Sequence, residues 1–201
     1  MAGRWKWFRE SDIEVMGYSL SWLAVKGKSP EAVRDELGFC PTGRREEFPE
    51  SELSAAEMPN GWYLIVSDRT EQVCPDAALQ RLSSAGGELI TCFIEEHVMA
   101  SKATGWKDGQ MKWSVTHDCQ KDRRHLDVQG EPPPEFAAIR DKLLAKDKPG
   151  EVDYIFDIPV ETAKSVAGYR HDEDVPGLTG DVFEVLAETR KTSFLKKMFG
   201  G

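Results

Sequence analysis

Apolar residues occur in short runs along this chain, and two of these runs are followed by nearly the same turn and helix signal. The runs cover residues 18–25 and 61–67, and the segments 29–37 and 74–82 come after them. Each of these segments has a proline at its second position, where a proline suits the first turn of a helix. The pattern predicts a strand, turn and helix that occur twice, with both helices on the same side of a sheet.

The later part of the chain changes to patterns typical of antiparallel strands. Residues 88–95 are rich in apolar and β-branched side chains, and residues 110–117 alternate apolar with polar positions, as a half-buried strand does. An Asp-Gly pair at 108–109 is the signal of a tight hairpin turn. Further strands are expected at 97–106, 124–129 and 152–158, and helices at 51–57, 135–146, 159–167 and 181–199.

Together these elements predict an α+β fold. We expect a mixed or mainly antiparallel sheet of five to seven strands with helices packed on one face, containing the duplicated strand-turn-helix unit. Residues 1–170 are expected to form a single domain, and residues 171–201 to supply an acidic loop and an amphipathic C-terminal helix that packs on the same domain. In that helix the acidic residues come early and the basic residues late, as the helix dipole favours.

Composition limits the classes of protein that this chain can represent. Its 201 residues, 40% of them hydrophobic, are enough for one domain with a real core. The formal net charge of −9 argues against a general nucleic-acid binder, because phosphate contacts need clustered lysine and arginine. We expect a cytoplasmic protein with reduced thiols and no membrane span, since the four cysteines lack a paired spacing and no apolar run is long enough.

Four side chains are the candidates for catalysis: Cys92, His97, His117 and Asp118. A thiol nucleophile needs a histidine base within hydrogen-bonding distance, and Cys92 with His117 on neighbouring strands is the pairing that the pattern allows. Adjacent strand residues point to opposite faces, so His117 and Asp118 do not readily act together. The competing interpretation is a buried Cys92 and polar residues at the rim of the sheet.

Known cofactor and metal motifs do not fit the chain. Residues 27–29 follow a predicted strand but lack the earlier glycine of a phosphate-binding loop, and Pro30 offers no amide hydrogen to a phosphate. The acidic and histidine residues at 95–97 lack the second histidine of a zinc-protease motif. Residues 171–174 lack the glycine and closing glutamate of a calcium loop. We therefore expect no cofactor and no metal.

Acidic residues gather in two loops, and this favours binding over catalysis. An acidic surface attracts a basic partner and speeds the encounter of the two proteins. The sequence therefore predicts a non-enzymatic protein that binds another protein, with a small hydrolase or transferase as the alternative. Acidic, tryptophan-rich chains of this form are common among uncharacterised bacterial and immunity proteins, so a bacterial immunity or accessory role is one expectation. The candidate binding residues are Glu46, Glu47, Glu50, Glu52, Trp106, Asp172, Glu173 and Asp174.

Overall fold

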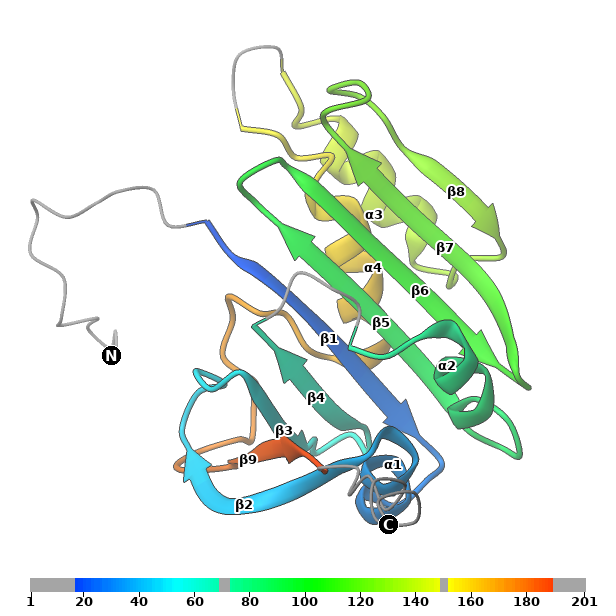
Figure 1. The fold of residues 1–201 in the computed structure, drawn as a ribbon. Coiled ribbons are helices and arrows are strands. Elements are labelled where there is room, and N and C mark those ends of the chain that lie inside the picture. The colour runs from blue at the N-terminus through cyan, green and yellow to red at the C-terminus, as the bar shows by residue number, and fades with distance from the viewer. Residues whose placement is uncertain (1–16, 69–72, 149–151, 190–201) are drawn as a thin grey trace, which may run out of the picture.

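In the part of the chain that the structure describes, nine antiparallel strands form one sheet, and four helices pack around it (Figure 1). The structure is a computed structural model that describes residues 17–68, 73–148 and 152–189. The strand order is β2-β9-β3-β4-β1-β5-β6-β7-β8. The strands are β1 (Ser19–Lys26), β2 (Phe39–Glu46), β3 (Leu53–Glu57), β4 (Tyr63–Ser67), β5 (Glu88–Glu95), β6 (Ala100–Lys107), β7 (Gln110–Asp118), β8 (Asp127–Gly130) and β9 (Phe183–Glu188). The helices are α1 (Pro30–Leu37), α2 (Asp76–Leu82), α3 (Phe136–Leu144) and α4 (Asp157–Ala167).

The strands of the two early strand–helix segments lie at the centre of the sheet, and their helices cover one of its faces. β1 and β4 pair directly, and α1 and α2 each follow one of them. The Ser29 hydroxyl accepts a hydrogen bond from the Ala32 amide at 3.3 Å, and Gly38 ends α1 in the left-handed conformation that favours glycine. Val33 of α1 and Leu79 of α2 belong to the same buried cluster, so both helices cover the same face, as predicted.

Beyond these helices the two segments follow different courses. β2 runs to the edge of the sheet, whereas β5 pairs with β1 at its centre. The sheet is therefore not symmetric about the two segments, and the duplicated unit remains a prediction from the sequence. The sheet has nine strands rather than the predicted five to seven.

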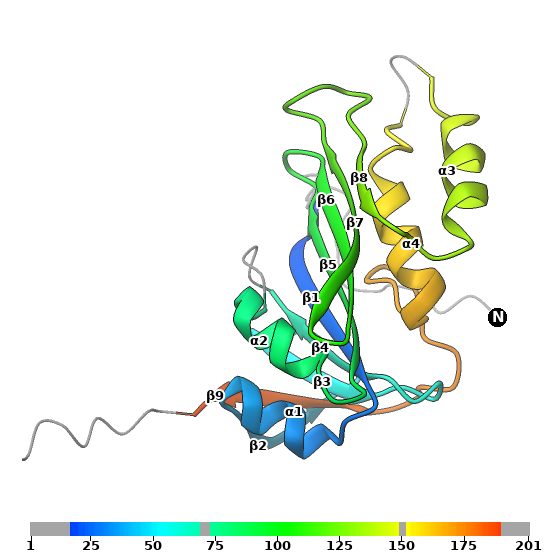
Figure 2. The same ribbon diagram turned by 90° about the vertical axis from the view of Figure 1, so that its right-hand side faces the viewer.

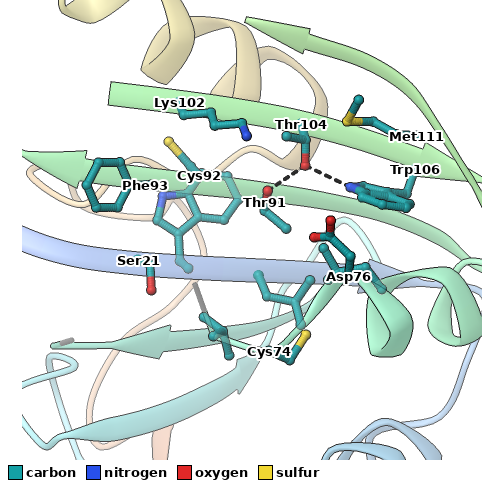
Figure 3. A pocket seen from close by; sticks show the side chains of 14 residues that line it. Ser21, Cys74, Asp76, Thr91, Cys92, Phe93, Lys102, Thr104, Trp106 and Met111 are labelled. Atoms are coloured by element: carbon teal, nitrogen blue, oxygen red, sulfur yellow. Dashed lines mark hydrogen bonds between the residues drawn. The ribbon is translucent and has the colours of Figure 1, made fainter. Parts of the chain in front are cut away.

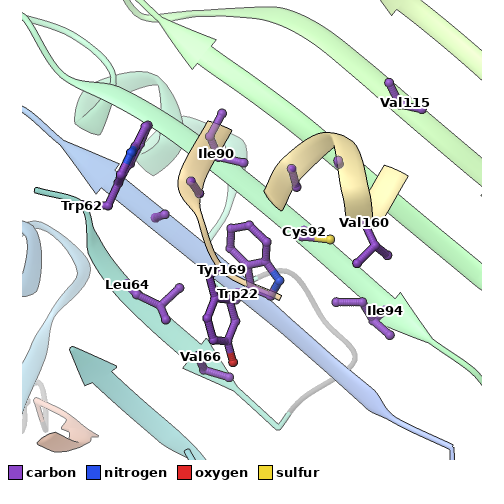
Figure 4. Close-up of a cluster of buried hydrophobic side chains, with 14 of the residues drawn as sticks. Trp22, Trp62, Leu64, Val66, Ile90, Cys92, Ile94, Val115, Val160 and Tyr169 are labelled. Carbon is purple, nitrogen blue, oxygen red and sulfur yellow. The ribbon is translucent and has the colours of Figure 1, made fainter. Parts of the chain in front are cut away.

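Helices cover both faces of the sheet, so the prediction that they lie on one face is wrong (Figure 2). α3 and α4 pack on the face opposite α1 and α2, and α4 lies over β5, β6 and β7. Figure 4 shows the larger core beneath them, where Trp22 packs edge-on against Tyr169 with ring centroids 5.4 Å apart. Trp62, Leu64 and Ile90 belong to the same cluster.

Three segments adopt structures that differ from the sequence-based expectations. Residues 51–57, predicted as a short helix in a surface connection, contain β3, and residues 152–158, predicted as a strand, lead into α4. Part of the expected C-terminal helix, 181–199, is the strand β9, which fills the space between β2 and β3. The other part, residues 190–199, lies outside the described residues. In the described segments, no helix has the length and apolar character needed to cross a membrane.

Candidate functional site

The four catalytic candidates do not form a common site in the structure. Cys92 is 1% exposed inside the larger core, and burial raises the pKa of its thiol. His117 lies on β7, two strands away from Cys92 on β5. His97 is exposed in the β5–β6 turn, with Nδ1 2.8 Å from Glu95 Oε1, and Asp118 accepts a hydrogen bond from a backbone amide in the turn after β7. This placement gives Cys92 no histidine base at hydrogen-bonding distance.

A pocket of about 290 Å³ lies beside α2 on the face that α1 and α2 cover (Figure 3). Thr91 and Thr104 share a hydrogen bond of 2.6 Å between their hydroxyls, and Trp106 Nε1 donates to Thr104 Oγ1 at 2.9 Å. Burial raises the pKa of Cys74 to about 12, so this thiol stays protonated near neutral pH. Three polar side chains of the pocket, including the predicted binding residue Trp106, therefore already satisfy one another.

A second hollow, of about 280 Å³, lies where the two acidic loops meet. The loop between β2 and β3 forms one side, and the segment after α4 forms the other. Both apolar and acidic side chains line it. We call this feature the acidic hollow, and the lining residues that matter here are Glu47, Phe48, Glu173, Asp174, Val175 and Leu178.

The carboxylates around the acidic hollow differ in how far the protein neutralises them. Glu173 pairs with Lys164 Nζ at 2.7 Å, and Asp172 pairs with Arg170 Nε at 2.6 Å. Within the described part of the chain, Glu47 and Asp174 make no hydrogen bond or ion pair. These two carboxylates are therefore available to a cation from outside the protein.

The remaining acidic candidates lie on the same β2–β3 loop. Glu46 is used internally, because it accepts hydrogen bonds from the Ser51 amide at 3.1 Å, the Ser51 hydroxyl at 2.7 Å and the Ser54 hydroxyl. Burial alone would raise the pKa of Glu46, but these hydroxyl groups hold it below its ordinary value. Glu50 and Glu52 are exposed. Glu46 therefore shapes the loop, whereas its neighbours face solvent.

Strand pairing fixes both walls of the acidic hollow. Glu46 at the end of β2 lies opposite Phe183 at the start of β9. Arg45 donates from Nε to the Asp181 carbonyl oxygen at 2.8 Å and from Nη2 to the Val182 carbonyl oxygen at 2.9 Å. The β2–β9 pair therefore holds together two segments that are far apart in the sequence.

His171 forms part of the inner wall of the acidic hollow. Its side chain is 1% exposed and packs edge-on against Tyr18, with ring centroids 4.8 Å apart. Burial lowers the pKa of His171, although Glu96 Oε1, 3.5 Å from Nε2, and Asp172 favour the charged form. His171 therefore adds no positive charge to the acidic hollow near pH 7, and the charge of the hollow comes from its carboxylates.

Comparison with known proteins gives no relative from which a function could be transferred. No protein-family model matches the chain, and no curated protein or solved structure matches it either. The sequence identified the acidic loops, but not their meeting around one hollow. The pairing of β2 with β9 brings the two acidic loops together. The prediction of a helix over 181–199 did not allow for this strand pairing.

Proposed function

We propose that this protein acts in the cytoplasm by binding another protein, without catalysis, and that the acidic hollow receives a basic side chain of that partner. The observation that carries the proposal is the convergence of two acidic loops on one hollow. Glu47 and Asp174 on its rim have no partner among the described residues, so an incoming cation would not have to displace an existing ion pair.

The walls of the acidic hollow suit a long basic side chain. Phe48 is 45% exposed, and Val175 and Leu178 are partly buried beside it. Lysine and arginine bury their aliphatic stems against apolar surface while the charged head remains at a polar rim. The apolar side chains of the acidic hollow, together with the carboxylates of Glu47 and Asp174, provide both parts of that arrangement.

The hollow is smaller than a stable protein interface. A volume of about 280 Å³ accommodates a side chain, whereas a specific complex buries about 800 Å² on each partner. The contact therefore extends onto the exposed acids of the same loop, Glu50 and Glu52. The net charge of −9 would speed encounter with a basic partner. A bacterial immunity or accessory protein that covers such a partner would act in this way.

The alternative of a small hydrolase or transferase has less support. Cys92 lies inside the core, His97 pairs with Glu95 in an exposed turn, and neither contacts His117 in the described part of the chain. The proposal of binding rests instead on Glu47 and Asp174, which face solvent and have no partner among the described residues.

The proposal is tested by affinity capture with the full chain, followed by binding kinetics on the captured partner. The double variant Glu47→Gln/Asp174→Asn keeps the shapes of both side chains and removes two charges. We expect the association rate constant to fall about three- to tenfold at low salt, because electrostatic steering is lost. The difference should shrink as the salt concentration rises, since salt screens exposed charges.

The matched control is Asp127→Asn/Glu131→Gln, which removes the same charge at β8, on the opposite edge of the sheet from β2. It should retain an association rate close to that of the wild-type chain. Equal rates for the hollow variant and the wild-type chain would contradict the proposal. Capture of no partner by the wild-type chain would contradict it as well.

A further inference from the structure

A buried histidine at the far end of β7 has one ring nitrogen whose role the hydrogen bonds define. His117 is 0% exposed, and its Nδ1 lies 2.8 Å from the backbone carbonyl oxygen of His125. A carbonyl oxygen only accepts hydrogen bonds, so Nδ1 carries the proton and donates. In the neutral ring, Nε2 therefore presents a lone pair.

That lone pair faces a second buried acceptor. His117 Nε2 lies 3.2 Å from Asp153 Oδ2, the side chain of Asp153 is 10% exposed, and neither atom has a hydrogen-bond partner in the described part of the chain. Asp153 Oδ1 is held by the amides of Ile155 at 3.0 Å and Phe156 at 3.4 Å, just before α4. Two acceptors at this distance repel each other unless a positive species lies between them.

Two species can satisfy this pair: a proton on Nε2 or a metal ion bound to both atoms. Cys119 favours the metal ion, because its Sγ lies within 4.8 Å of a ring nitrogen of His117 and of a carboxylate oxygen of Asp153. An ion pair between imidazolium and carboxylate does not require a nearby thiol. Imidazole, thiolate and carboxylate, in contrast, are all ligands that Zn²⁺ binds in proteins. We infer that His117, Cys119 and Asp153 form a binding site for a zinc-type divalent cation.

The distance between His117 and Asp153 is compatible with tetrahedral coordination. Zinc bonds of about 2.0–2.2 Å to nitrogen and oxygen place those two ligand atoms about 3.3 Å apart, close to the observed 3.2 Å between His117 and Asp153. The hydrogen bond from Nδ1 to a backbone carbonyl is the outer-shell contact that orients metal-bound histidines. Three protein ligands leave a fourth position for water.

The cation would fasten two segments that already lie against each other. His117 and Cys119 belong to the end of β7 and the turn after it, and Asp153 belongs to the segment that starts α4. Nearby, Arg123 makes two hydrogen bonds to the buried Asp147 carboxylate, at 2.8 and 3.1 Å. This ion pair holds the turn after β7 against the end of α3. The site is independent of the acidic hollow.

Metal titration of the full chain tests this inference. The chain is first stripped with a chelator and kept reduced, and Co²⁺ is then added as a spectroscopic probe. We expect one Co²⁺ per chain, a thiolate-to-cobalt charge-transfer band, and loss of that band when Zn²⁺ is added. Cys119→Ser should abolish the band, and Asp153→Asn should weaken Zn²⁺ binding by about tenfold or more. The matched control is Cys40→Ser, which removes an exposed thiol on β2 and should leave the band unchanged.

A second measurement needs no variant. Zn²⁺ should slow alkylation of Cys119 in the wild-type chain, read by mass spectrometry, and leave alkylation of Cys40 at its original rate. Equal alkylation of Cys119 with and without Zn²⁺ would overturn the inference. Binding of less than one Co²⁺ per chain, or a charge-transfer band that survives in Cys119→Ser, would overturn it too.

Discussion

The two faces of the sheet bury different kinds of side chain. The face under α3 and α4 holds the larger core, with Trp22, Trp62, Trp113 and Tyr169 among its buried side chains. The face under α1 and α2 holds a smaller core that is mostly aliphatic. Its helices have eight and seven residues, and the pocket beside α2 is on this side. Large aromatic side chains bury the most apolar area, so the α3–α4 face should contribute more to stability.

Both proposed sites are built on the α3–α4 face. His117 packs edge-on near Phe156, with ring centroids 6.5 Å apart, and the acidic hollow is lined by Tyr169 and Phe183. Phe156, Tyr169 and Phe183 all belong to the larger core. The segments after β8 complete the larger core, and they supply one side of each site: Asp153 for the cation site, and Glu173 and Asp174 for the acidic hollow. A substitution in the larger core should therefore also weaken binding at the acidic hollow and at the cation site, whereas a substitution in the smaller core should not.

The most direct test of whether the larger core contributes more to stability is to remove one large side chain from each face. Trp22 and Leu82 are both 0% exposed, the first in the larger core and the second in the smaller. Trp22→Ala should lower the free energy of unfolding by about 4 kcal/mol and Leu82→Ala by about 3 kcal/mol, measured by urea denaturation. An equal or larger loss in Leu82→Ala would mean that the smaller core contributes as much as the larger one.

A glycine on the α3–α4 face gives a sharper test. A methyl group added at Gly105 would lie 2.1 Å from Trp113 Nε1, far closer than atoms can approach. Gly105→Ala should therefore destabilise the protein by about 1–3 kcal/mol, because Trp113 must leave its place in the core. Without the clash, alanine in a strand would be more stable than glycine, so the sign of the change reports the contact.

The same urea experiment has an internal control. Trp113→Phe removes the indole nitrogen that clashes, and it should recover part of the loss when combined with Gly105→Ala. A neutral or stabilising effect of Gly105→Ala alone would show that β6 and β7 are less tightly packed than the structure indicates.

Elements with signals in their own sequence could be predicted. α1 has a serine cap at its start and Gly38 at its end, and its observed bounds agree with the expected segment 29–37. The central strands also agree, because their apolar runs are short and bounded by turns. These signals act between neighbouring residues, so no knowledge of the tertiary structure is needed to read them.

Elements whose structure depends on distant partners could not be predicted. The apolar positions in 181–199 fit a helix as well as a strand, and the choice is made by the space between β2 and β3. The segment 152–158 is β-branched and apolar, yet it leads into α4 because its apolar side chains pack on the sheet as part of the larger core. The sites depend on the same distant pairings. Asp153 lies beside His117 because the segment that leads into α4 packs against the end of β7.

A buried ionisable group on the α3–α4 face gives the smallest effect. Burial lowers the pKa of His171, although Asp172 and Glu96 favour its charged form. Below about pH 6.5 His171 therefore binds a proton in the unfolded chain more readily than in the folded chain. Because the unfolded chain binds more protons, the free energy of unfolding should fall as the pH is lowered from 7. One proton limits the slope to about 1.4 kcal/mol per pH unit. His171→Gln cannot take up this proton, so its urea stability should fall less steeply over the same range. Identical slopes for the two proteins would show that His171 titrates alike in the folded and unfolded chain, and that the inner wall of the acidic hollow is open to water.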